Sequence, residues 1–228
     1  TIPSSVTSIG GGAFYDCGSL KNVLIDYKVK YIHEYAFHGC YSLANITVNN
    51  ADNLTYIGKG AFEGCYSLKS IVIPKNVTRI ESYTFKGCSS LNQINILSRI
   101  KFIGEEAFYQ CKFNEIALHD VTTIEKRSFI SCKSLTKISI PESVTKIDEF
   151  AFYFCQALTE VCIPSSVNTI GSNAFENCTS LKKVDIVNNS LLNVIDSNAF
   201  KNCSSLLEIR IPSSVNTIGS NAFENCTS

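Results

Sequence analysis

Residues 2–20 decide the fold, and they read I-P-S-S-V-T-S-I-G-G-G-A-F-Y-D-C-G-S-L. The same pattern returns along the whole chain, with a Cys three residues after a Phe in every copy. The phenylalanines of the ten copies are Phe14, Phe37, Phe62, Phe85, Phe108, Phe129, Phe152, Phe175, Phe200 and Phe223, and successive ones lie 21 to 25 residues apart. Such a period is typical of solenoids, in which each repeat is one coil that buries its apolar side only against its neighbours.

The pattern within one repeat predicts how each coil is built. The written-out unit is V-x-x-I-x-x-x-A-F-x-x-C-x-S-L-x-x-I-x-I-P. Its L-x-x-I-x-I part ends in an alternation of period two, which predicts a strand with one buried face. Its A-F-x-x-C-x-S-L part has apolar residues three apart, which favours a helical or 3₁₀ turn. We therefore expect an α/β repeat solenoid with a parallel β-sheet on one face and short helical or 3₁₀ turns and loops on the other.

The domain organisation follows from counting these units. Residues 1–228 are expected to form a single solenoid of about ten units of 21–25 residues. Local insertions are predicted at residues 49–56 and 187–194, and a shortened unit around Cys111. Because neither terminus carries a polar cap, the chain is interpreted as a segment of a longer array that lacks its caps. Residues 163–180 and 211–228 are identical, which indicates recent copying of a unit or engineering of an end.

Composition and motifs argue against several classes of function. Twenty basic and twenty acidic side chains give zero net charge without a basic block, so nucleic-acid binding is not expected. No stretch approaches the roughly 18 apolar residues of a membrane helix, so no membrane insertion is expected within this segment. The chain contains no nucleotide-binding, hydrolase or zinc-protease motif, and His33, His38 and His119 are scattered. We predict no catalytic, cofactor-binding or metal-binding residues, and a protein that is not an enzyme.

Ten of the eleven cysteines occupy one column of the repeat. They could form disulfides or metal sites, or an inward ladder of reduced thiols. Neighbouring coils of a parallel sheet are about 4.8 Å apart, whereas the Cβ atoms of a disulfide are roughly 3.5–4.5 Å apart. This difference favours buried free thiols. Cys162 alone falls at an outward strand position, where it is either a possible exposed thiol that could join chains or a single drifted position.

The repeat resembles the BspA-like leucine-rich repeats, a 23-residue type found in large surface proteins, and the likeness covers essentially the whole chain. The resemblance implies a leucine-rich-repeat horseshoe or superhelix. It also implies a cell-surface or secreted protein of adhesin type that binds host, matrix or neighbouring-cell proteins or glycoproteins. N-x-[S/T] sites such as Asn45 and Asn53 are consistent with secretion, although the repeat itself creates three N-C-[S/T] sites. The alternative is an intracellular scaffold that holds partners in an assembly.

Candidate partner-binding residues lie in two sets of outward columns. One set flanks the inward strand positions, and the other consists of tyrosines, which are favoured in interfaces. The candidates are Tyr41, Tyr66, Tyr35, Tyr83, Lys69, Gln93, Asn95, Lys137, Lys183 and Arg210. The alternative for the tyrosines is that they only shield an edge of the solenoid.

Overall fold

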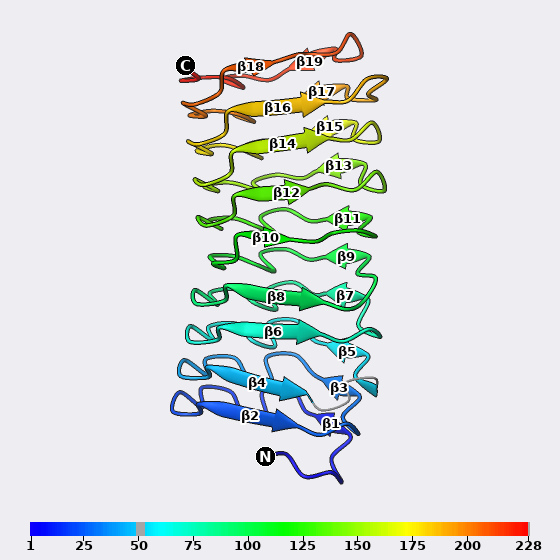
Figure 1. Cartoon of the computed structure of the whole chain (residues 1–228), viewed down its shortest axis with the longest axis vertical. Helices are drawn as coiled ribbons and strands as arrows, with labels where there is room; N and C mark the ends of the chain where they lie inside the picture. The colour runs from blue at the N-terminus through cyan, green and yellow to red at the C-terminus, as the bar shows by residue number, and fades with distance from the viewer. Residues whose placement is uncertain (49–52, 228) are drawn as a thin grey trace. The chain divides into compact units, whose positions relative to one another are not determined.

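The computed structural model describes residues 1–48 and 53–227, and the chain divides into two compact units, unit 1 (residues 1–113) and unit 2 (residues 114–228). Each unit is a parallel β-solenoid in which a coil contributes one strand to a broad strand face and a two-residue strand to a narrow face (Figure 1). The prediction of a parallel sheet is therefore confirmed. The prediction of one uninterrupted solenoid over residues 1–228 stays a prediction.

In unit 1 the strand face consists of two hydrogen-bonded pairs. They are β2 (Asn22–Ile25) with β4 (Asn45–Val48), and β6 (Ser70–Ile73) with β8 (Gln93–Ile96). The narrow face contains β1 (Ser8–Ile9), β3 (Tyr31–Ile32), β5 (Tyr56–Ile57), β7 (Arg79–Ile80) and β9 (Phe102–Ile103). Residues 49–52 of the predicted insertion lie outside the described residues.

In unit 2 the strand face is one sheet in chain order. It contains β10 (Glu115–Ile116), β12 (Lys137–Ser139), β14 (Glu160–Ile163), β16 (Lys183–Ile186) and β18 (Glu208–Ile209). The narrow face contains β11 (Thr123–Ile124), β13 (Lys146–Ile147), β15 (Thr169–Ile170), β17 (Val194–Ile195) and β19 (Thr217–Ile218).

The predicted helical or 3₁₀ turn is wrong. Residues 1–48 and 53–227 contain no α-helix, and the A-F-x-x-C segment is a series of β-turns. In the first coil the N–H groups of Tyr15 and Cys17 donate to the carbonyl three residues back, at 3.0 and 3.1 Å. Those of Phe14 and Asp16 instead donate to carbonyls of the next coil, both at 2.7 Å. A 3₁₀ helix would keep all these bonds within the segment, whereas here every second one joins neighbouring coils.

Left-handed backbone at two positions explains this alternation. In every coil the residue two before the Phe and the residue two after it have a positive φ, for example Tyr35 (56°) and Phe154 (63°). Such residues interrupt a right-handed helical run, and Gly and Asn adopt this conformation most readily. In the later coils Asn occupies the second position, where Nδ2 of Asn202 donates to Oδ1 of Asn177 at 3.0 Å and Nδ2 of Asn225 to Oδ1 of Asn202 at 2.8 Å.

The core of each unit is a column of stacked phenylalanine rings beside a column of thiols. Neighbouring rings have centroids 5.0–5.7 Å apart in unit 1 and 5.2–5.4 Å apart in unit 2. Within each unit, thiols donate to the phenylalanine carbonyl of the preceding coil. Sγ of Cys40 donates to Phe14 O at 3.1 Å, and Sγ of Cys155 donates to Phe129 O at 3.2 Å. Burial raises the pKa of Cys40 to about 11 and that of Cys155 well above its usual range, so both stay protonated donors. The column therefore uses Cys as a small apolar residue that also donates.

Candidate functional site

The two insertions in the repeat coincide with two hollows in the strand faces. Phe37 and Phe62 are 25 residues apart, as are Phe175 and Phe200, whereas the usual spacing is 23. At the first insertion β4 and β6 belong to different sheets of unit 1. At the second, β18 pairs with only the first two residues of β16. In both places the hydrogen-bonded pairing of the two strands is missing or shortened, and a hollow is lined by residues of both strands.

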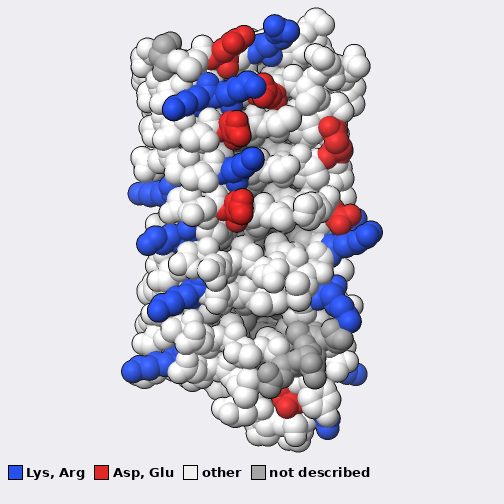
Figure 2. Space-filling view, viewed as in Figure 1, with Lys and Arg blue, Asp and Glu red and all other residues white. Residues whose placement is uncertain are grey.

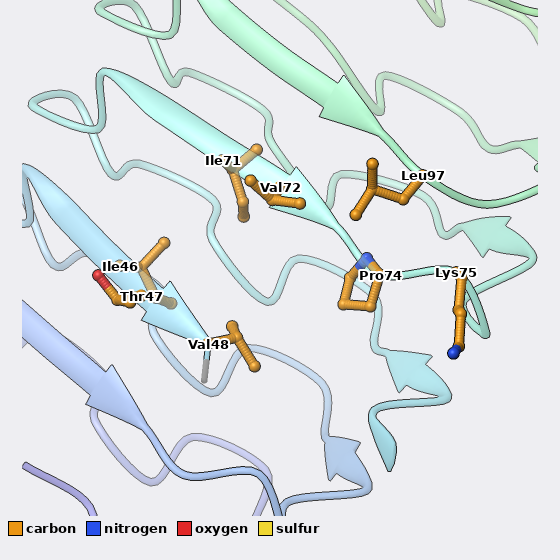
Figure 3. Close-up of a pocket in the computed structure, with 8 residues that line it drawn as sticks. All are labelled: Ile46, Thr47, Val48, Ile71, Val72, Pro74, Lys75 and Leu97. Carbon is orange, nitrogen blue, oxygen red and sulfur yellow. The ribbon is translucent and has the colours of Figure 1, made fainter. Parts of the chain in front are cut away.

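The hollow in unit 1 is mainly apolar (Figure 3). It has a volume of about 370 Å³ and is lined by Ile46, Thr47, Val48, Ile71, Val72, Pro74, Lys75 and Leu97. Val72 and Leu97 are 47% and 58% exposed, although their side chains are aliphatic. No carboxylate lies among the lining residues, and Lys75 provides the one charged group. An exposed apolar hollow beside a cation can receive an aliphatic or aromatic side chain of a partner.

The hollow in unit 2 is charged. It has a volume of about 220 Å³ and is lined by Lys183, Val184, Asp185, Ile186, Asn188, Glu208 and Arg210. Lys183 Nζ lies 2.6 Å from Asp185 Oδ2, and this hydrogen bond raises the pKa of Lys183. Lys183 and Asp185 pair with each other, so fewer of the charged groups in this hollow are available to a partner.

The strand face of unit 2 also carries a ladder of alternating charges. Successive register partners along β10, β12, β14, β16 and β18 are Glu115, Lys137, Glu160, Lys183 and Glu208. Figure 2 shows basic and acidic side chains alternating over these strands, whereas the strands of unit 1 are almost free of both. Opposite charges on neighbouring strands stabilise pairing modestly, and their fields cancel at a distance. The ladder is therefore a poor attractor for a strongly charged partner.

The candidate residues from the sequence are placed as follows. Lys69, Gln93 and Asn95 are exposed on the strand face of unit 1, and Lys137, Lys183 and Arg210 are exposed on that of unit 2. Lys137 and Lys183 belong to the charge ladder, and Arg210 lines the charged hollow. Their role in partner binding stays a prediction.

The four candidate tyrosines fall into two columns of unit 1. Tyr41 and Tyr66 are stacked, with ring centroids 5.3 Å apart and an interplanar angle of 11°, and are 46% and 51% exposed. Tyr35 and Tyr83 are half-buried and have positive φ. A Cβ on Gly60 would lie 2.4 Å from the Tyr35 ring, so that ring fills the space which the glycine leaves. Tyr35 therefore serves the packing between coils, whereas Tyr41 and Tyr66 present an aromatic surface.

Cys162 is exposed on β14, beside Ser139 of β12 and Asp185 of β16. Partial burial and the nearby carboxylates of Asp185 and Glu142 raise the pKa of this thiol. It is therefore less nucleophilic at neutral pH than an ordinary surface cysteine.

Residues 1–48 and 53–227 hold no group of three or more His, Cys, Asp or Glu side chains placed to bind a metal ion. Within the same residues, no helix is long and apolar enough to span a bilayer.

Sequence reasoning missed the apolar hollow. Pro74, Lys75 and Leu97 lie just beyond the ends of β6 and β8, and the pattern of a single repeat does not indicate that they share one hollow with Val72. The two 25-residue spacings were the only signal in the sequence, because an inserted pair of residues must displace a neighbouring strand or bulge from the surface.

Comparisons with known proteins agree with this architecture. The profile of the BspA type leucine rich repeat region matches residues 1–115 and 101–228. A leucine rich cell surface protein from Faecalibacterium prausnitzii is 28% identical in sequence, over 98% of this chain and 75% of its own, with a TM-score of 0.57. A leucine-rich repeat protein from Bacteroides ovatus is 26% identical, over 99% and 75%, with a TM-score of 0.64. A leucine rich repeat protein of T. pallidum is 28% identical, over 77% and 72%, with a TM-score of 0.53. No match was found among curated proteins.

Proposed function

Because this chain belongs to the BspA-type leucine-rich repeat family, we propose that it is a non-enzymatic module that binds proteins through its strand face. We place it in an adhesin-type protein, at the cell surface or secreted, that engages host, matrix or neighbouring-cell macromolecules. The family and the leucine-rich repeat fold are consistent with an interaction module.

The exposed apolar hollow of unit 1 is the observation that carries the proposed binding role. Soluble surfaces rarely present aliphatic side chains around a concavity, and interface hot spots are apolar positions that a partner desolvates. Val72 and Leu97 meet this description. Support for the surface location comes from the F. prausnitzii relative, which is itself described as a cell surface protein.

Binding to immobilised extracellular matrix, with immobilised cytosolic extract as the comparison, tests this proposal. Val72→Asp introduces the residue that Asp185 carries in the same column, so the fold should tolerate it. Ser139→Asp is the matched control, in the same column of unit 2. We expect Val72→Asp to weaken matrix binding by about tenfold or more, as at other interface hot spots, and Ser139→Asp to leave it unchanged.

Three outcomes would contradict the proposal. Equal binding by both variants would remove the hollow as the contact. Stronger binding to cytosolic extract than to matrix would favour an intracellular scaffold. Labelling of intact cells with an impermeant biotin reagent tests the location separately, and protein labelled only after lysis would exclude the surface.

A further inference from the structure

Unit 1 has a second hollow that differs in chemistry from the apolar one. It lies where β2 and β4 begin, has a volume of about 490 Å³, and is lined by Lys21, Asn22, Ser42, Ala44, Asn45, Ser67, Lys69 and Ser90. Its lining contains no carboxylate and no large apolar side chain. The surface therefore offers hydroxyl, amide and ammonium groups together.

The hydroxyl groups form a row with one member in each of three successive coils. Ser42, Ser67 and Ser90 each lie two residues after the cysteine of their coil, so neighbours are about 4.8 Å apart. None of these hydroxyls bonds to another residue that the structure describes. Beside them, Nδ2 of Asn45 donates to Oδ1 of Asn22 at 2.8 Å, which leaves the Asn22 amide nitrogen and the Asn45 amide oxygen for a ligand.

The two lysines carry unpaired positive charge. Lys21 and Lys69 occupy the same column two coils apart, on the order of 10 Å by the spacing of strands. Both are exposed, and neither forms an ion pair with a described residue. They favour an anionic ligand, but two charges are too few to hold a nucleic-acid backbone.

An aromatic stack begins at the edge of this hollow. Tyr41 and Tyr66 directly precede Ser42 and Ser67, so the stack lies within one residue of the hydroxyl row. The next coil carries Ser89 in place of a third ring. Because Ser89 is small and exposed, it does not cover the outer face of Tyr66 as another ring would. Tyr41 and Tyr66 are 46% and 51% exposed.

The geometry points to a binding site for an anionic carbohydrate, independent of the protein-binding role proposed above. A pyranose ring presents a C–H face that stacks on an aromatic ring and a rim of hydroxyls that exchange hydrogen bonds. Tyr66 provides the stacking surface, and the serine row with Asn22 and Asn45 provides the polar partners. Lys21 and Lys69 pair with carboxylate or sulfate groups of the sugar.

Titration calorimetry with defined oligosaccharides tests the site in the 228-residue chain. The probes are a heparin tetrasaccharide, a hyaluronan tetrasaccharide, neutral cellotetraose and sodium sulfate. We expect at least one acidic tetrasaccharide to bind, more weakly as salt rises, and the stronger of the two identifies sulfate or carboxylate as the preferred group. Equal affinity for cellotetraose, or for sulfate alone, would overturn the assignment.

The test variants introduce residues that neighbouring coils carry in the same columns, so that folding is preserved. Tyr66→Ser copies Ser89, and Lys69→Asn copies Asn92. We expect each to weaken binding about threefold to tenfold, the first at every salt concentration and the second mainly at low salt. Lys182→Asn is the matched control, since it removes a lysine of the same column in unit 2 where no tyrosine pair is present.

Two results would refute this site. Unchanged affinity in both Tyr66→Ser and Lys69→Asn would show that the sugar binds elsewhere, as would an equal loss in Lys182→Asn. Val72→Asp separates the two proposals, because it is expected to weaken the binding of a protein partner and to leave oligosaccharide binding intact.

Discussion

Replacing Gly104 by Ala should destabilise the protein because of one close approach between coils. A Cβ at residue 104 would lie 2.4 Å from the backbone nitrogen of Ser82 and 2.8 Å from the carbonyl carbon of Glu81. Both are backbone atoms, so one coil must move by about 0.6 Å to restore an allowed contact. A gap of that size forfeits a quarter to a half of the dispersion energy of the contacts that it opens, and overpacking of this kind typically costs about 1–3 kcal/mol.

Gly10 provides a matched control in the same column. A Cβ there would meet nothing within 4 Å, and neither glycine has a positive φ. Gly10→Ala should therefore stabilise by about 0.4–1 kcal/mol, because alanine reduces the entropy of the unfolded chain. The two variants should thus differ by about 1.4–4 kcal/mol in free energy of unfolding, measured from urea midpoints in far-UV circular dichroism with each slope reported. Equal midpoints for Gly104→Ala and Gly10→Ala would show that the backbone contact does not limit this column.

Three further predictions follow from the core and the narrow face. Cys40 should resist a thiol reagent at pH 8, because a pKa of about 11 leaves roughly one thiolate in a thousand, and labelling mapped by mass spectrometry should rise as pH approaches 11. Phe152→Ala should lower stability by about 3–5 kcal/mol in thermal unfolding, whereas Tyr153→Ala on the half-buried side of the same turn should cost far less. The Tyr56 hydroxyl donates to Glu34 at 2.7 Å and lowers the pKa of that carboxyl, so this stabilisation is present above the unfolded pKa of Glu and is lost as pH falls through the lower folded value. Tyr56→Phe should therefore show a smaller loss of melting temperature on acidification than the parent, and an unchanged acid dependence would contradict the pairing.

Much of the interior could be predicted from the sequence, because the buried positions recur once per repeat and carry apolar residues in every coil. The L-x-x-I-x-I pattern located strands such as β6 and β14, and the Phe and Cys columns are the buried columns of the structure. The narrow face was missed, because two residues are too short to show an alternation of period two, as at Tyr31–Ile32.

The positions of left-handed backbone could not be recognised in every coil, because the residue types at some of them do not indicate this conformation. Glycine and asparagine mark them in some coils, but Tyr35 and Phe154 adopt the same conformation and carry no such signal. Helical spacing of apolar residues then suggested a turn of the wrong kind. The polar and apolar hollows of unit 1 depend on how neighbouring coils lie against each other, so no single repeat contains them.

The asparagine ladder of the later coils bears on glycosylation. Asn177, Asn202 and Asn225 each precede a cysteine of the thiol column and then Ser or Thr. The left-handed backbone, which favours Asn, and the cysteine column therefore create a glycosylation tripeptide together. The Nδ2 atoms of Asn202 and Asn225, which a glycosyltransferase would modify, are the atoms that donate to the neighbouring asparagine. Coil closure and glycan transfer therefore compete for the same nitrogen, and an enzyme would have to reach it before the coils close. These three tripeptides follow from the shape of the coil and are therefore evidence neither for nor against secretion.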